Sequence, residues 1–282
     1  MIRIITDTAS DLSIQDAKDL DVTLLPMTIE FGKESFKDRY EIEPQEFYER
    51  LNTSDDFPIT SQVNPFEFKE VLKKYAQAGD DVIIITLGSN FSGTFQSAHL
   101  ASSNYDNVYV VDSSTVTVAQ QCLVRYAATL RDKGLSAKEI VNKLNKNVDN
   151  VRVLAIVDTL EYLKKGGRIS SAAAVAGGLL SIKPILTTIN GLATIVGKAR
   201  GKKNANTLFK KLITEAGGID YNKPIAFAYS GTSSEGLDAY LEENKDMYQD
   251  KTDSLYISQM GSSVGTHGGP GVIAIGFFTP TA

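Results

Sequence analysis

Apolar runs rich in β-branched residues alternate with helical patterns over the first part of the chain. The apolar runs are Ile2–Ile5, Val82–Leu87, Val108–Val111 and Val151–Val157. Each run ends in a small polar loop, and helical patterns follow at Ile14–Leu20, Ser92–Ala101, Val116–Arg131 and Leu160–Lys165. Near-continuous apolar strands that alternate with helices are typical of βαβ units, so this part predicts a parallel sheet covered on both faces.

The rest of the chain follows a different pattern. Two β-rich segments, Ser181–Ile189 and Leu192–Ala199, flank Asn190-Gly191, a dipeptide that strongly favours a tight hairpin turn. Further helices are expected at Asn204–Ala216 and Ser233–Asn244, and further strands at Ile225–Ser230, Ser254–Met260 and Gly271–Phe278. A hairpin within a run of α/β units indicates a mixed or antiparallel sheet, and therefore a second domain.

These patterns predict an α/β protein of two domains. Residues 1–160 are expected to form an N-terminal α/β domain with a parallel sheet. Residues 161–282 are expected to form a smaller C-terminal α/β domain with a mixed or antiparallel sheet. The boundary is expected near Asp158–Ser171, and the pattern leaves open whether the segment 55–68 also crosses between the domains.

Composition and charge argue against several classes of protein. The 282 residues are 42% hydrophobic and 22% charged, and 29 basic against 34 acidic side chains give a formal charge of −5. A protein that binds nucleic acid through phosphates usually has a basic surface, so nucleic-acid binding is not favoured. Cys122 is the sole cysteine, which excludes an internal disulfide and fits a reducing compartment.

The sequence also gives no sign of a targeting or membrane segment. The N-terminal segment Met1–Asp7 lacks the long apolar core of a signal peptide. The longest weakly polar run, Ser170–Ile182, is flanked by Arg168 and Lys183 and is too short to span a bilayer. A soluble, cytoplasmic protein without an integral membrane segment is therefore expected.

The loop after the second apolar run is a candidate anion site. The segment Leu87–Thr94 leads from a strand into a helix and places Ser92 where a helix N-cap is expected. The free N–H groups and the positive dipole end of a helix start attract anions, and Gly93 lets a ligand approach the backbone. Simple capping of the helix by Ser92 explains the same residues equally well. The loop lacks the lysine of a P-loop, so nucleotide binding is not supported.

Two further segments place polar side chains in loops. Thr60 and Ser61 precede a helix expected to begin near Pro65, and capping or turn formation explains their hydroxyls well. Arg168 follows two glycines and precedes an expected helix of small side chains that includes residues 172–178. Small residues allow tight packing or room for a guest, and an arginine at the mouth of such a segment is a natural partner for a carboxylate.

The glycine-rich segment before the last strand raises the question of a serine hydrolase. Gly261–Gly265 matches the G-x-S-x-G pattern, in which the nucleophilic serine needs a strand before it and a helix directly after it. Here glycines and Pro270 follow and then a strand, so a loop is expected rather than a nucleophile elbow. A lipid or ester hydrolase that uses Ser92 or Ser263 with His267 stays an alternative, although no acidic residue follows His267.

The remaining candidates carry less weight. His99 and Cys122 lie within expected helices, and two histidines with one cysteine cannot build a common zinc site, so no metal site is expected. A basic run near the end of the hairpin comprises Lys198, Arg200, Lys202 and Lys203. Such runs are usually solvated, but in an acidic protein this one could dock an acidic or phosphate-bearing partner.

Six short motifs occur in an order that resembles one known family. The chain opens with I-x-T-D-T-A-S-D-L and continues with T-S-Q, S-G-T-F-Q-S-A, V-D-S-S, G-G-R-I-S and G-x-H-x-G-P-G. No single motif is specific, but the ordered set covers nearly the whole chain and resembles the DegV family. The resemblance implies a two-domain DegV-like fold.

The resemblance also implies a function. DegV-like proteins hold a long-chain fatty acid between their two domains. Members of the FakB type present its carboxylate to a separate fatty acid kinase, FakA, which uses ATP and magnesium to make an acyl-phosphate for phospholipid synthesis. The chain is then expected to be a lipid-binding subunit, not an enzyme, with no catalytic residue or cofactor of its own. A non-enzymatic regulatory protein, whose loops serve only as helix caps, stays a second alternative.

Carried over motif by motif, the resemblance implies which residues bind. The residues expected at the fatty-acid carboxylate are Thr60, Ser61, Ser92, Gly93, Arg168 and His267. The kinase is expected to contact the basic run that comprises Lys198, Arg200, Lys202 and Lys203. Gly201 departs from the family's pattern, in which many relatives have a bulkier residue there.

Overall fold

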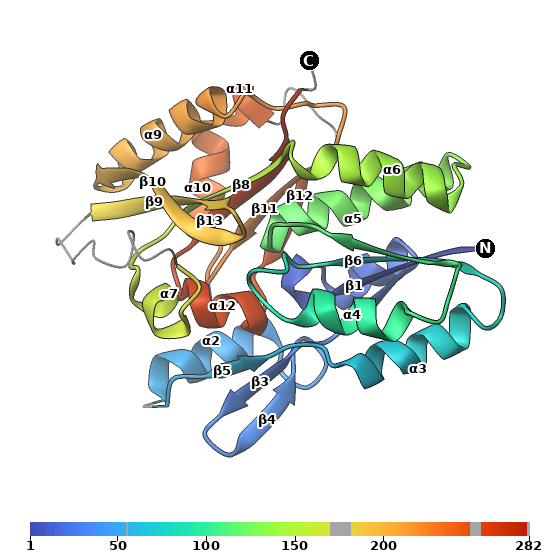
Figure 1. Cartoon of the computed structure of the whole chain (residues 1–282). Coiled ribbons are helices and arrows are strands. Elements are labelled where there is room, and N and C mark those ends of the chain that lie inside the picture. The colour runs from blue at the N-terminus through green and yellow to red at the C-terminus, as the bar shows by residue number, and fades with distance from the viewer. Residues whose placement is uncertain (55, 170–181, 249–254, 281–282) are drawn as a thin grey trace.

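The computed structural model describes residues 1–54, 56–169, 182–248 and 255–280 (Figure 1). Within these residues, one layer is a sheet of four parallel strands in the order β2-β1-β6-β7. The strands are β1 (Ile2–Asp7), β2 (Val22–Leu25), β6 (Asp81–Thr86) and β7 (Val108–Asp112). The parallel sheet predicted for the N-terminal part is therefore confirmed.

The second large layer is a mixed sheet. Over the described residues its order is β10-β9-β8-β13-β11-β12, with β11 and β12 parallel and the other neighbours antiparallel. The strands are β8 (Val151–Ile156), β9 (Ile182–Ile189), β10 (Leu192–Arg200), β11 (Ile225–Tyr229), β12 (Leu255–Gln259) and β13 (Ile273–Phe278). The predicted hairpin turn is present, because Asn190 and Gly191 both have the positive φ angles that it requires.

One strand predicted for the parallel sheet belongs to the mixed sheet. β8 runs antiparallel to both β9 and β13, so the assignment of Val151–Val157 to the parallel sheet is wrong. The run is apolar because both faces are covered. Val153 and Ala155 line a cavity on one face, and Leu154 and Ile156 pack into an apolar cluster on the other. A strand buried on both faces does not reveal the direction of its partners.

A small antiparallel sheet, which the sequence patterns do not reveal, lies beside the parallel sheet (Figure 1). Its order is β4-β3-β5, and the strands are β3 (Thr28–Phe31), β4 (Glu34–Lys37) and β5 (Ile59–Ser61). Strands this short show no clear alternation of polar and apolar residues. Both α2 (Pro44–Thr53) and α12 (Ser262–Gly268) pack against this sheet or its apolar cluster. The segment 55–68 thus places β5 next to a helix from the end of the chain.

Helices cover the faces of the large sheets (Figure 1). The helices of the N-terminal part are α1 (Ile14–Asp19), α3 (Pro65–Tyr75), α4 (Thr94–Ser102), α5 (Thr117–Asp132) and α6 (Ala137–Val148), and a 3-10 turn η1 (Thr8–Ser10) follows β1. After α7 (Glu161–Gly166), one face of the mixed sheet is covered by α9 (Lys202–Glu215), α10 (Glu235–Glu243) and α11 (Lys245–Tyr248). The helix expected at residues 172–178 lies outside the described residues.

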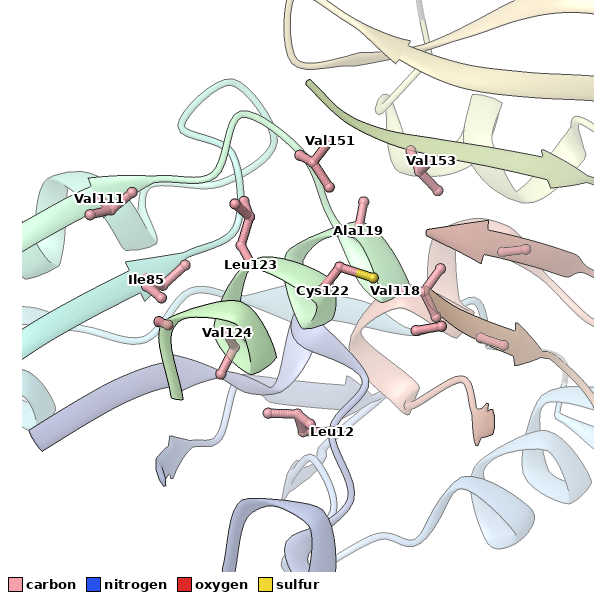
Figure 2. Packing of buried hydrophobic residues seen from close by; sticks show 14 of the residues in the cluster. Leu12, Ile85, Val111, Val118, Ala119, Cys122, Leu123, Val124, Val151 and Val153 are labelled. Atoms are coloured by element: carbon pink, nitrogen blue, oxygen red, sulfur yellow. The ribbon is translucent and has the colours of Figure 1, made fainter. Parts of the chain in front are cut away.

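The helix α5 lies between the two large sheets and joins their cores. One apolar cluster contains residues of α5 together with residues of both sheets. Figure 2 shows Cys122 and Val118 of α5 in this cluster, with Ile85 from β6 and Val153 from β8. The two predicted domains therefore share one continuous core, although the boundary near residue 160 stays a prediction.

Close packing of α5 on β13 predicts a large effect from a small substitution. At Gly276 in β13, an added Cβ would lie 2.4 Å from backbone atoms of Val118 in α5, which is closer than real Cβ contacts. Gly276→Ala is expected to lower the free energy of unfolding by about 2–3 kcal/mol, measured by urea denaturation. Gly236→Ala in α10 is the control, because the nearest side-chain atom there is 3.6 Å away. Equal stability of the two variants would contradict this packing.

Candidate functional site

A cavity of about 380 Å³ lies between the parallel sheet and the mixed sheet. This volume falls within the range of roughly 300–1,000 Å³ that is typical of small-molecule sites. Most of the lining is apolar and comes from both layers, for example Leu87 and Phe91 after β6, Val153 and Ala155 in β8, and Ala274 in β13. A cavity with these walls can hold a long apolar group out of water.

Polar side chains line part of the same cavity. The wall of the cavity includes all of the residues that the sequence predicts at a fatty-acid carboxylate, the head group of the ligand. They are Thr60, Ser61, Ser92, Gly93, Arg168 and His267. They come from β5, from the loop before α4, from the segment after α7, and from α12. Residues far apart in sequence thus meet at one place, which we call the head-group site.

Thr60 and His267 form the central hydrogen bond of the head-group site. The distance between Thr60 Oγ1 and His267 Nε2 is 3.0 Å. β5 holds Thr60 opposite Ile29 of β3, and α12 presents His267 from the other side. Gly166 in α7 lies directly behind the ring, where a Cβ would come 2.0 Å from His267 Nδ1. The ring is therefore enclosed between three elements.

Enclosure keeps the imidazole of His267 neutral at pH 7. Burial and, as the smaller cause, the positive charge of Arg168 together lower its pKa from 6.5 to about 4. His267 Nδ1 is buried and has no hydrogen-bond partner among the described residues. A buried N–H without an acceptor is rarer than an unfilled lone pair, so the proton is better placed on Nε2. Nε2–H then donates to Thr60 Oγ1, and the hydroxyl of Thr60 is free to donate to a ligand.

Arg168 brings a positive charge to the head-group site. It follows Gly167, whose left-handed backbone ends α7. Its Nε donates to the backbone oxygen of Phe91 at 3.2 Å, and its Nη1 donates to that of Gly166 at 2.7 Å. Among the described residues, no acidic side chain forms an ion pair with Arg168. A half-buried guanidinium without a carboxylate partner suits an anionic ligand.

The loop before α4 differs from the prediction in one respect. The helix begins at Thr94 and its N-cap is Gly93, so the assignment of Ser92 as N-cap is wrong. Ser92 Oγ instead accepts a hydrogen bond from Thr94 N at 3.3 Å and lies 3.0 Å from Thr94 Oγ1. The glycine leaves room for the side chain of Gln62, whose Oε1 lies 2.1 Å from where a Cβ of residue 93 would be.

Gln62 is a cavity residue that the sequence interpretation did not single out. Its Nε2 donates to Ser97 Oγ in α4 at 2.8 Å, and its side chain lies against Gly93. It therefore joins the end of β5, which contains Thr60, to the start of α4, which follows Ser92. Gln62 is the third residue of the T-S-Q motif, and this position was the signal in the sequence that could have identified it as a cavity residue.

The glycine-rich segment forms a helix, not the expected loop. Residues Ser262–Gly268 form α12, so the expectation that no helix follows the serine of the G-x-S-x-G pattern is wrong. The geometry nevertheless gives the hydrolase no support. Ser263 Oγ donates to a carboxylate oxygen of Asp38 and lies 3.3 Å from Thr8 Oγ1, while His267 Nε2 is paired with Thr60. No serine–histidine pair is formed within the described parts of the chain.

The comparisons with known proteins concern the family and the fold of the whole chain. The model of the DegV family, a family of uncharacterised proteins, matches residues 1–280. This chain belongs to the DegV family. A DegV domain-containing protein of Caldanaerobacter subterraneus subsp. tengcongensis is 33% identical over 284 residues, which cover 98% of each chain.

Two solved structures of proteins that are named for fatty-acid binding share the fold of this chain. A fatty-acid-binding DegV family protein from Thermus thermophilus matches with a TM-score of 0.89 and 29% identity over 99% of both chains. The stearic-acid-binding protein of Eubacterium ventriosum matches with a TM-score of 0.87 and 29% identity, over 99% of this chain and 98% of that one. The DegV fold predicted from the sequence motifs is thus confirmed.

The basic run of this DegV chain lies apart from the cavity. Lys198 and Arg200 end β10, and Lys202 and Lys203 begin α9; all four side chains are exposed. None of them lines the cavity. Across the described residues, no helix is both long and apolar enough to cross a bilayer, and no group of three acidic, histidine or cysteine side chains could hold a metal ion.

The neutral state of His267 predicts a pH dependence. NMR of labelled histidines should give a pKa of about 4 for His267, and Arg168→Met should raise that pKa because a repelling charge is removed. The unfolded chain, with an ordinary histidine pKa of about 6.5, binds the proton first as the pH falls. The folded state should therefore lose roughly 3 kcal/mol between about pH 6.5 and pH 4 relative to His267→Gln.

The variant His99→Gln identifies the signal of the other histidine in the chain. A pKa near 6.5 for His267 in the parent protein would show that the ring is not enclosed as described.

Proposed function

We propose that this chain binds a long-chain fatty acid in the cavity and presents its carboxylate to a separate, ATP-dependent fatty acid kinase. Fatty-acid binding by the Thermus thermophilus and Eubacterium ventriosum proteins supports the first half of the proposal. The observation that carries it is the combination of an apolar cavity with Arg168 and Thr60 at the same wall. The second half rests on the resemblance of the sequence motifs to FakB-type proteins.

The apolar lining supplies the affinity in this proposal. Each methylene removed from water gains roughly 0.8 kcal/mol, so about fourteen methylenes gain on the order of 10 kcal/mol before the entropy of binding is subtracted. Val153 and Ala155 of β8, and Val157 directly after it, line the cavity and offer an apolar track to the acyl chain. The tail therefore holds the ligand, and the head group sets its position.

The head-group site offsets the cost of burying a carboxylate. An ion that leaves water loses several kcal/mol unless it is paired and hydrogen-bonded. The guanidinium of Arg168 provides the opposite charge, and the hydroxyls of Thr60, Ser61 and Ser92 can donate to the carboxylate oxygens. The neutral His267 orients Thr60 by donating to its oxygen. A hydroxyl that accepts one hydrogen bond becomes a better donor for the next.

The chemistry belongs to the partner in this proposal. The kinase transfers the γ-phosphoryl group of ATP, with magnesium, to a carboxylate oxygen, which gives an acyl-phosphate and ADP. This chain supplies the substrate and no catalytic residue or cofactor, and it acts in the cytoplasm, where ATP is present. The exposed run Lys198, Arg200, Lys202 and Lys203 gives an acidic partner surface a place to dock.

The head-group assignment predicts a loss of affinity. Thr60→Ala combined with Ser92→Ala should weaken binding of a long-chain fatty acid at least tenfold, because hydrogen bonds to a charged group are lost. Thr53→Ala with Ser103→Ala is the control, since those hydroxyls are exposed and lie outside the cavity. Affinity is measured by titration of delipidated protein, and the native ligand by extraction and mass spectrometry. Equal affinities of the two double variants would remove Thr60 and Ser92 from the site.

The docking assignment predicts a charge effect on the kinase reaction. Lys202→Glu with Lys203→Glu should raise the KM of the kinase for the loaded protein about tenfold or more, and less so at high salt, because opposite charges no longer meet. Lys210→Glu with Lys211→Glu changes the charge of α9 by the same amount further along the helix and should act weakly. If both pairs act alike, the effect comes from net charge and the basic run is not the docking site.

A further inference from the structure

A fully buried carboxylate holds the start of α12. One oxygen of Asp38 accepts hydrogen bonds from Ser262 N at 3.0 Å and Ser262 Oγ at 2.6 Å. The other accepts from Ser263 N at 3.2 Å and from Ser263 Oγ. This set of donors compensates the buried charge. The G-S-S-V-G segment, considered first as a hydrolase motif, thus serves as the binding site for an acidic side chain of the same chain.

Two neighbours of Asp38 complete this attachment. Asp11 Oδ1 accepts a hydrogen bond from Gly261 N at 2.8 Å, and Arg39 Nη2 donates to the backbone oxygen of Gln259 at 2.9 Å. Asp11 and Arg39 both have positive φ angles, of 57° and 67°, which are unfavourable for residues that carry a Cβ. Such conformations persist where surrounding contacts enforce them, and they gather at functional sites.

The small sheet connects Asp38 to the head-group site. Lys37, the last residue of β4, pairs with Thr28 of β3, and Thr28 pairs with Ser61 of β5. Asp38 and Thr60 therefore extend from opposite edges of one three-stranded sheet. α12 meets this sheet at both of its ends: its first turn is held by Asp38, and its last turn places His267 on Thr60.

Between these two attachments, the middle of α12 is closely packed on α2. At Gly265 an added Cβ would lie 2.5 Å from the hydroxyl oxygen of Tyr48 and 2.8 Å from a ring carbon of Phe47, so α12 lies directly on α2. A helix of two turns that is packed this closely moves as a rigid piece. A displacement of its first turn is therefore carried to His267.

We propose that Asp38 is a positioning residue for the head-group site: it fixes α12 on the small sheet so that His267 meets Thr60 in the orientation that lets Thr60 donate to the fatty-acid carboxylate. The role in binding rests on the proposed function. The effect on His267 does not, because it concerns the protein without a ligand. Asp38 lies outside the cavity lining and so acts through α12.

The test compares variants of delipidated protein by NMR of labelled His267. Asp38→Asn replaces two acceptor oxygens with one and places an NH₂ group against donors. Ser262→Ala is the milder variant, because it removes one donor to Asp38, leaves the backbone N–H in place and does not touch the cavity lining. Ile213→Ala controls for loss of stability alone, because Ile213 is a buried residue of α9 in the apolar cluster on the far face of the mixed sheet.

The expected result is a change in the His267 ring signals in Asp38→Asn and, to a smaller extent, in Ser262→Ala. Its pKa should rise toward the ordinary histidine value as enclosure is lost, and fatty-acid affinity should fall about tenfold. Ile213→Ala should leave the signals and the affinity unchanged.

Ring signals of Ser262→Ala that coincide with those of the parent would overturn the proposal, even if Asp38→Asn fails to fold. A parent protein that binds no fatty acid would instead refute the proposed function, and the His267 signals would still decide whether Asp38 positions the ring.

Discussion

The packing of α5 between the two large sheets is the constraint from which the cavity arises. Side chains of this helix belong to the same apolar cluster as strands of the parallel sheet and strands of the mixed sheet. Because a helix is about 10 Å across with its side chains, the sheets stay separated along its length. At its N-terminal end, Val116 and Thr117 reach the cavity wall, and there the gap between the sheets is not filled by the helix. The cavity is thus a consequence of how the two halves share one core.

Charges are distributed unequally around this gap. Asp7 and Asp11 are fully buried, and burial raises the pKa of each to about 6 even though both accept several hydrogen bonds. Asp7 accepts from Leu87 N, Ala9 N and Gln120 Nε2, so its negative charge is compensated from within the protein. Arg168 hydrogen-bonds to backbone oxygens alone among the described residues. The positive charge of Arg168 therefore lies at the cavity wall, whereas Asp7 and Asp11 lie outside the lining.

Glycine and short polar residues have a mechanical role at the head-group site. Gly166 and Gly265 allow a ring to lie against a helix backbone, and Gly93 makes room for Gln62. In the packing as it stands, a Cβ at any of these three positions would lie within 2.5 Å of a neighbouring side-chain atom. In this chain the motif residues glycine, serine and threonine therefore join elements at short distances and also bring hydroxyl groups to the cavity wall.

The sequence alone predicted β1, β6, β7 and the hairpin, because apolar runs and Asn190-Gly191 are local signals. It missed the short strand β2. The residues of the head-group site came from the resemblance of the ordered motifs, and their role in binding stays a prediction. The sequence did not reveal that β8 belongs to the mixed sheet, because an apolar run that is covered on both faces does not indicate which strands pair with it or in which direction. It also suggested a loop at Ser262–Gly268, because glycine disfavours helices; the carboxylate of Asp38, distant in sequence, stabilises α12 there. Which polar groups face one another across the cavity was decided by tertiary packing, since those contacts join residues that no local pattern connects.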